Sequence, residues 1–320
     1  MIDSIPTRVT EILKIRYPIL QAGMVWAAGY RLAVACAEAG ILGCIGSGSM
    51  KPEMLRQQVE KAKALTKGRL SVNVPLLRGD AAELLEVALT GGIEIIVSSA
   101  GNPALFAERI QRAGVTWIHV VPGVKHGKKA ESCGVDIVVG EGFEAGGHNG
   151  IDEVTTFCLI PQLVDALRVP VVAAGGIADG RQFLAALALG AEGISVGTRF
   201  AATPESSAHE NYKRAVVEAG DGATTLFAKK IAPVRAIKNP WVERVREAEA
   251  GGATREQLRE VYGQKHARQG ILEGDTVEGE MEAGQSSGLI RDVLPAAEVV
   301  RRFVEEYERT RFAKPASSST

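Results

Sequence analysis

Between Pro18 and Val196 the sequence alternates short apolar runs with longer segments in which apolar residues recur every three to four positions. The apolar runs have few polar interruptions, as is typical of parallel strands covered on both faces. There are eight of them, at residues 18–23, 41–46, 70–75, 93–99, 115–121, 135–141, 169–176 and 192–198. We interpret each run as one β-strand.

The segments between the runs have the periodicity of amphipathic helices. Some begin with a residue that favours a helix start, since Asn102 precedes Pro103 and Asp179 precedes Gly180. The predicted helices are 31–39, 52–65, 81–89, 103–113, 157–167 and 180–189. Regularly spaced strand–helix units predict a (β/α)8 TIM barrel. The alternative, an open doubly wound sheet, needs a topological switch point that this spacing does not indicate.

The pattern changes after Arg199, where polar, helix-type sequence replaces the alternation. We therefore predict that the barrel spans residues 8–202 and that a helical insertion over 203–280 forms a substrate-side subdomain. Residues 281–312 are predicted to hold a glycine-rich covering loop and the closing helix of the barrel, which begins near Pro295. The small polar residues of 313–320 predict a disordered tail.

The composition narrows the function classes. The 320 residues are 46% hydrophobic and 23% charged, with a formal net charge of -1. This balance gives no overall attraction to nucleic acid or to an anionic membrane. We identify no signal peptide and no apolar run long enough to span a bilayer, and we interpret the four cysteines as buried, reduced thiols, so a cytoplasmic protein is expected.

Small residues recur where the predicted strands end, which is the catalytic end of a barrel. These ends are Gln21–Met24, Gly46–Ser49, Asn73, Ser98–Gly101, Glu141–Gly150, Gly175–Gly176 and Gly197–Thr198. Glycine lets a ligand approach the backbone closely. The loops after strands seven and eight form the usual phosphate site of this fold, so the last two ends predict a phosphorylated ligand such as FMN. Tight βα turns alone are the simpler explanation for any single glycine.

The segment GEGFEAGGHNG at residues 140–150 places one histidine, His148, among five glycines. An imidazole can donate a hydrogen bond or a proton near neutral pH, whereas Glu141 and Glu144 could orient it or bind ribityl hydroxyls. The sequence contains no G-x-S-x-G, no Walker-type and no H-E-x-x-H motif, and no zinc ligand spacing. The pattern favours redox chemistry on a bound cofactor, with no metal.

Nine segments in order resemble one superfamily, the FMN-dependent nitronate monooxygenases and enoyl-acyl-carrier-protein reductases II. They are YPILQAGMVW (17–26), GSGSM (46–50), VNVPLL (72–77), SAGNP (99–103), EGFEAGGHNG (141–150), VPVVAAGGIADGR (169–181), GAEGISVGTRFAATPESSAHENYK (190–213), PVRAIKN (233–239) and EGEMEAGQSSGLI (278–290). The glutamate-containing, double-glycine loop around His148 is most similar to the enoyl reductase II branch.

The resemblance implies a role for each site residue. His148 corresponds to the active-site histidine of the family. The other implied residues bind the cofactor. Ala22, Gly23 and Met24 would lie along the isoalloxazine, Asn73 would contact its polar edge, and Ser47 stands where a glycine is common. Glu141, Gly146 and Gly147 would face the ring and ribityl chain, Gly175, Gly176, Gly197 and Thr198 would hold the phosphate, and Gln285 would close over the flavin.

The same resemblance implies reduction of the 2,3 double bond of an enoyl-acyl-carrier-protein with NADH or NADPH as co-substrate, and a homodimer. Nitronate monooxygenase is the alternative activity, and NAD(P)H:quinone reductase a further one. A flavin-binding protein without turnover is the non-enzymatic alternative, against which His148 argues. The basic run VKHGKKAE (124–131), with Lys128 and Lys129, could dock an acidic carrier protein or form a solvated helix face.

Overall fold

A computed structural model describes residues 2–312, and the tail predicted at 313–320 lies outside the described residues. Eight parallel strands form one sheet in the order β1-β9-β8-β6-β5-β4-β3-β2. They are β1 (Ile19–Gln21), β2 (Gly43–Gly46), β3 (Leu70–Pro75), β4 (Ile95–Ser99), β5 (Thr116–Val121), β6 (Ile137–Glu141), β8 (Val171–Ala174) and β9 (Gly193–Val196). The sheet closes where Leu20 of β1 bridges Leu42 and the N–H of Gln21 donates to the Leu42 carbonyl at 2.9 Å. The predicted (β/α)8 barrel is confirmed, and the doubly wound alternative is excluded.

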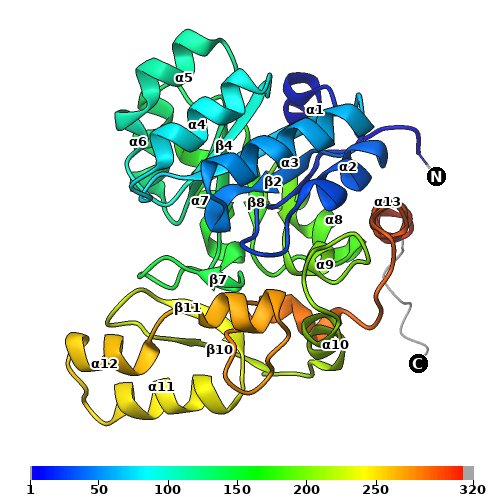
Figure 1. Ribbon diagram of the computed structural model, residues 1–320. Coiled ribbons are helices and arrows are strands. Elements are labelled where there is room, and N and C mark those ends of the chain that lie inside the picture. The colour runs from blue at the N-terminus through cyan, green and yellow to red at the C-terminus, as the bar shows by residue number, and fades with distance from the viewer. Residues whose placement is uncertain (1, 313–320) are drawn as a thin grey trace, which may run out of the picture.

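Helices surround this barrel (Figure 1). They are α1 (Arg8–Leu13), α2 (Tyr30–Glu38), α3 (Pro52–Leu65), α4 (Ala81–Thr90), α5 (Ala107–Ala113), α6 (Val124–Ser132), α7 (Thr156–Ala166), α8 (Gly180–Ala188), α9 (Thr198–Ala201) and α13 (Ala296–Arg311). The last of these lies against α8 and α2, so the end of the chain completes the outer ring. Several strand–helix turns use the predicted start signals. The Asp179 side chain, for example, accepts hydrogen bonds from the first N–H groups of α8.

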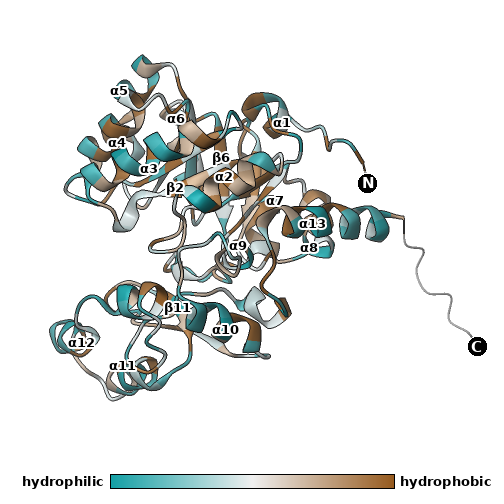
Figure 2. Ribbon diagram, turned by 45° about the vertical axis from the view of Figure 1, so that its right-hand side comes forward, coloured by the Kyte–Doolittle hydropathy of each residue, from teal (hydrophilic) through white to brown (hydrophobic). Residues whose placement is uncertain are grey.

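The apolar residues form two layers in the barrel. Inward-facing strand residues such as Leu20 and Ile118 fill the interior together with Val9 and Leu13 of α1, which covers the end of the barrel where the strands begin. A larger cluster lies between the strands and the surrounding helices. Hydrophilic residues lie on the outer surface of helices such as α3 and α13 (Figure 2). Because both faces of every strand are covered, the strands read as continuous apolar runs.

Residues 203–280 contain helices and also a small sheet that the sequence pattern did not indicate. The helices are α10 (Glu210–Glu218), α11 (Pro240–Ala250) and α12 (Arg255–Tyr262). The strands β10 (Thr224–Phe227) and β11 (Val234–Ile237) are antiparallel, and β11 also pairs with β7 (Gly147–His148). The subdomain has its own core around Phe227, Trp241 and Leu258 and lies beyond the carboxyl ends of the barrel strands (Figure 1).

Two further observations concern the surface. Cys36, Cys44 and Cys133 are buried as expected, but Cys158 is exposed, because it lies on the outer side of α7 next to the exposed Phe157.

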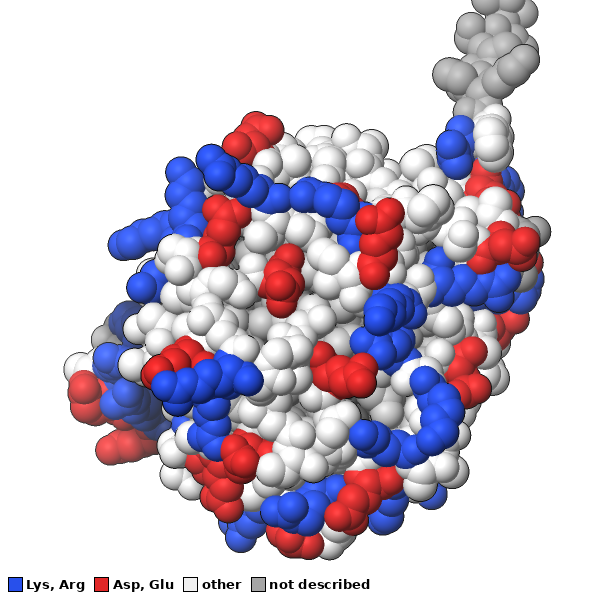
Figure 3. All heavy atoms as spheres, turned by 90° about the horizontal axis from the view of Figure 1, so that it is seen from above, with Lys and Arg blue, Asp and Glu red and all other residues white. Residues whose placement is uncertain are grey.

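On the face shown in Figure 3, acidic and basic side chains are interspersed, in keeping with the small net charge of -1. Within residues 2–312, no helix combines the length and the apolar character needed to cross a membrane.

Candidate active site

A cavity of about 680 Å³ opens where the barrel strands end and the subdomain begins. Its wall includes loops that follow several barrel strands together with residues of α10 and of the late segment 282–286. The sequence-predicted residues that line it are Ala22, Gly23, Met24, Asn73, Glu141, Gly146, Gly147, His148, Gly175, Gly176, Gly197 and Thr198. The residues predicted from the sequence come from five separate segments, and the fold places all five around one space.

Two predicted residues lie elsewhere. Ser47 is fully buried behind the cavity, where its hydroxyl donates to the Asn73 carbonyl at 2.6 Å. Ser47 begins a 3-10 turn, so its side chain points back into the fold. Gln285 is exposed, and its backbone N–H donates to the Glu144 carbonyl at 2.9 Å. The next residue, Ser286, lines the cavity in its place.

Glycines bring the loops of the site into direct backbone contact. A Cβ atom on Gly23 would lie 2.3 Å from Cβ of Asn73, and one on Gly146 would lie 2.6 Å from the carbonyl carbon of Ala283. Neither contact can be relieved by a small shift, because real Cβ atoms do not approach other heavy atoms this closely. These two glycines fix how closely the first loop approaches β3 and how closely the His148 loop approaches the late segment.

One corner of the cavity is built from backbone groups. Gly175 and Gly176 have φ angles of 93° and 74°, in the left-handed region that favours glycine. Within residues 2–312, their N–H groups donate to no protein acceptor. Across the corner, the Thr198 hydroxyl accepts a hydrogen bond from the Gly284 N–H at 2.9 Å. Unpaired N–H groups beside the start of a helix form an environment that suits an anion such as a phosphate.

His148 lies at the border between the barrel and the subdomain. It belongs to β7 and pairs with Val234 of β11, while its side chain is 68% exposed. Its Nδ1 atom is 3.9 Å from Oε1 of Glu282. Gly147 allows this approach, since a side chain there would meet the Glu282 carboxylate at 3.2 Å. An accessible imidazole beside a carboxylate is an arrangement that can donate or accept a proton in the cavity.

The two glutamates of the glycine loop have different roles. Glu141 lines the cavity, and burial raises the pKa of its carboxyl to about 7. Glu144 instead accepts hydrogen bonds from the N–H of Thr156, at 2.9 Å, and from its hydroxyl, at 3.1 Å. Glu144 therefore holds the loop against the start of α7 and does not face the ligand space.

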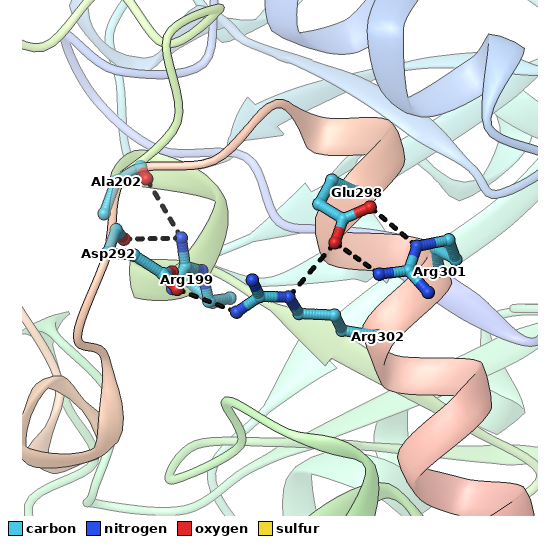
Figure 4. Close-up of polar contacts among 6 residues, drawn as sticks. All are labelled: Arg199, Ala202, Asp292, Glu298, Arg301 and Arg302. Atoms are coloured by element: carbon cyan, nitrogen blue, oxygen red, sulfur yellow. Dashed lines mark hydrogen bonds and ion pairs between the residues drawn. The ribbon is translucent and has the colours of Figure 1, made fainter.

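An ion-pair network holds Arg199, the residue that follows Thr198 of this corner (Figure 4). Arg199 follows Thr198 directly and is 6% exposed. Its guanidinium donates to the side chain of Asp292 at 2.9 Å and to the Asp292 carbonyl at 2.8 Å. Asp292 also pairs with Arg302 of α13 at 2.7 Å, and Arg302 in turn reaches Glu298. The network joins the end of the chain to the segment that carries Gly197 and Thr198.

Two further residues of the site were not singled out from the sequence. Glu282 lies beside His148, and burial raises the pKa of its carboxyl. Burial, together with the nearby Glu282, raises the pKa of the Glu280 carboxyl. Tyr212 of α10 lines the cavity and donates its hydroxyl hydrogen to the Glu282 carbonyl at 2.6 Å. Both occur in the quoted segments 278–290 and 190–213, but their spacing gives no sign that they meet His148.

The sequence profile of the nitronate monooxygenase family matches residues 6–306. The chain belongs to this family. The match spans the barrel, the subdomain and most of α13, so it covers every residue of the cavity wall. The members are flavin-dependent oxidoreductases, and the chain is accordingly an oxidoreductase.

Three relatives illustrate the range of the family. FabK from Thermotoga maritima is 37% identical with a TM-score of 0.91, over 96% of this chain and 98% of that one. A (3aS,4S,5R,7aS)-5-hydroxy-7a-methyl-1-oxo-octahydro-1H-indene-4-carboxyl-CoA dehydrogenase from Mycobacterium tuberculosis is 29% identical, over 93% of this chain and 95% of the relative. A probable nitronate monooxygenase from Staphylococcus haemolyticus is 32% identical, over 76% of this chain and 81% of the relative.

Proposed function

We propose that this protein is an FMN-dependent, NAD(P)H-linked reductase of the 2,3 double bond of an enoyl thioester, with enoyl-acyl-carrier-protein as the substrate in fatty-acid elongation. The observation that carries the proposal is the exposed imidazole of His148 facing a cavity that has an anion-binding corner. FabK, an enoyl-acyl-carrier-protein reductase II, aligns over nearly the whole chain. The mycobacterial relative is named for a substrate bound to coenzyme A, which is also a thioester.

The residues present fit FMN. The free N–H groups of Gly175 and Gly176, with Gly197 and Thr198, would hold the phosphate. The segment Ala22–Met24 would lie along the isoalloxazine, and Asn73 would contact its polar edge. The Asn73 amide is within 3.2 Å of the Ser99 hydroxyl, which fixes its orientation. When bound, FMN would supply the hydride-transfer chemistry, which protein side chains do not provide.

The chain itself would supply charge stabilisation and a proton. Reduction of an enoyl thioester places negative charge on the thioester oxygen, and a positioned donor lowers the barrier to that step. His148 is the donor in this proposal, because it is accessible from the cavity and has a carboxylate partner in Glu282. Glu141, whose pKa burial raises to about 7, would be protonated in part near neutral pH and could donate a hydrogen bond to the cofactor.

Nitronate oxidation is the second candidate. The family profile carries that name, and the staphylococcal relative is a probable nitronate monooxygenase at 32% identity. The same imidazole could act on an alkyl nitronate, so the residues of the site do not separate the two reactions. The acidic carrier protein as partner, the homodimer and the choice of NADH or NADPH are further parts of the first proposal.

The test is anaerobic. The purified holoprotein is mixed with NADH or NADPH and flavin absorbance is followed, after which crotonyl thioester is added. Rapid bleaching followed by return of the oxidised spectrum supports the enoyl reductase. In a separate run, oxidised protein is mixed with an alkyl nitronate. Slow bleaching by both nicotinamides, combined with rapid bleaching by the nitronate, would overturn the proposal in favour of the second candidate.

A further inference from the structure

The backbone of Trp26 has an unusual conformation. Its φ angle is 59°, and it is the one aromatic residue with a positive φ among residues 2–312. The left-handed region is unfavourable for a bulky side chain, by about 1 kcal/mol or more. The strain is held by hydrogen bonds from both sides. The Trp26 N–H donates to the Ser49 hydroxyl at 3.1 Å, and the Ser207 hydroxyl donates to the Trp26 carbonyl at 2.7 Å.

These restraints present the indole to the cavity. Trp26 lines the cavity and packs against the apolar cluster that joins the first barrel loop to the subdomain. The guanidinium of Arg268 lies over the ring, 5.8 Å from its centroid. Arg268 begins η3 (Arg268–Leu272), a π-helical turn, and also pairs with Glu273 at 2.9 Å. A cation held over an indole face is an attractive contact that limits the movement of both groups.

The space beside the indole is apolar. Trp26 shares this part of the wall with Ala201 of α9, with Ala267 and Ile271 around η3, and with the ring of Tyr212. The Tyr212 hydroxyl is already engaged by the Glu282 carbonyl. This part of the wall thus offers hydrocarbon surface with its polar group satisfied, which is an environment for an alkyl chain and not for a nucleotide. We call the space bounded by these five residues the acyl compartment.

We propose that Trp26 is a specificity-determining residue whose indole closes the acyl compartment and limits the length of the substrate chain, with Arg268 as the positioning residue that holds the ring. The strained backbone explains why the ring takes this place, because a relaxed residue here would send its side chain in another direction. That the ligand is an acyl thioester rests on the proposed function. The position of Trp26 in the cavity wall does not depend on that function.

The kinetic test compares chain lengths in the flavin-loaded, full-length protein. For wild type, Trp26→Ala, Trp26→Phe and Arg268→Gln, kcat/KM is measured with crotonyl and decenoyl thioesters. Trp26→Ala should raise the decenoyl-to-crotonyl ratio about tenfold or more, since each buried methylene contributes roughly fourfold in binding. Trp26→Phe should leave the ratio within about threefold, and Arg268→Gln should give an intermediate rise. Leu77→Ala is the matched control, because Leu77 also lines the cavity but is 79% exposed and lies outside the acyl compartment.

A binding test separates this inference from the proposed function. Of the three tryptophans, Trp117 and Trp241 are each 1% exposed, so Trp26 is the one that a cavity ligand can reach. Saturated butyryl and decanoyl thioesters, which cannot be reduced, are titrated while tryptophan emission is recorded. Decanoyl thioester should change the emission of wild type and leave that of Trp26→Phe unchanged.

The outcomes are distinct. Binding of decanoyl thioester without a change in Trp26 emission, or an unchanged chain-length ratio in Trp26→Ala, overturns the inference and leaves the proposed function standing. If Trp26→Ala does not fold, two other results together overturn the inference. They are an unchanged chain-length ratio in Arg268→Gln and a Trp26 emission that does not change when decanoyl thioester binds. Failure of every acyl thioester to bind wild type overturns the proposed function, and the acyl assignment of the compartment fails with it.

Discussion

The Nδ1 atom of His148 and the Oε1 atom of Glu282 lie 3.9 Å apart, across the border between the barrel loop and the late segment. The distance exceeds that of a hydrogen bond, so the contact is one of charge and orientation. When Glu282 is ionised, its carboxylate favours a proton on Nδ1 and leaves the other ring nitrogen for the cavity. In the proposed reaction Glu282 would thereby act through His148.

Replacing Glu282 with Gln should lower kcat by about tenfold with little change in KM, because substrate binding stays while the donor loses its partner. Steady-state kinetics with crotonyl thioester measure both parameters. The ¹⁵N spectrum of the His148 ring should report a changed tautomer ratio in the same variant. Glu278→Gln is the control on the same segment, since Glu278 pairs with Arg244 on the surface. A Glu282→Gln enzyme with wild-type kcat would contradict the assignment.

The anion-binding corner predicts a selective loss of cofactor. Gly176→Ala forces an alanine to φ 74° and places its Cβ 3.3 Å from the Glu144 side chain. We expect the flavin content per chain to fall at least several-fold after gel filtration, because the backbone N–H must shift away from the phosphate. Absorbance of flavin released by acid measures this content.

Gly222→Ala is the matched control for the backbone strain. Gly222 has a φ angle of 66° and open space around it. Both variants carry a cost of about 1 kcal/mol for the left-handed alanine. Equal flavin loss in the two variants would mean that strain alone, and not the corner, explains the effect.

His119 predicts how stability depends on pH. The ring is 3% exposed, and its Nδ1 atom lies 2.7 Å from the Ser98 hydroxyl. Burial lowers the pKa of His119 to about 4 from its ordinary value of 6.5. The unfolded chain therefore binds a proton that the native state does not, so this stability is fully present above about pH 6.5 and is lost as the pH falls toward 4.

Wild type should lose unfolding free energy as the pH falls from about 7 to 4.5. We expect His119→Gln to lose about 2 kcal/mol less than wild type over this range. Urea unfolding at the two pH values measures the difference. His126→Gln serves as control, because His126 is exposed on the neighbouring α6. The interpretation fails if both variants show the same pH dependence as wild type.

The barrel could be predicted from the sequence because each strand is a local apolar run and each helix a local period. β10 and β11 could not, since polar residues interrupt both (TTLF and VRAI) and the third strand of their sheet, β7, consists of Gly147 and His148. Those two residues carry no strand signal, and their pairing depends on the tertiary position of Val234 and Arg235. A sheet assembled from segments without a local apolar run is specified by the fold and not by local composition.

The candidate site, like the fold, could be predicted from the sequence only in part. Residues at strand ends, such as Gly23 and Gly176, were predicted to share one space because the topology of a barrel requires it. Ser47 shares that topology, but its side chain turns toward the Asn73 carbonyl, and strand position alone does not give side-chain direction. Glu282 is distant from His148 in the chain, so only the folded structure reveals the contact.

The network around Arg199 joins two distant parts of the sequence. The glycine and threonine positions of the anion-binding corner lie between residues 175 and 198. Asp292, which pairs with the neighbouring Arg199, comes 93 positions after it, and Arg302 pairs with Asp292 from α13. During synthesis the corner is therefore made well before the residues that hold Arg199. A chain that stops short of Asp292 should keep the barrel strands and bind the proposed cofactor more weakly.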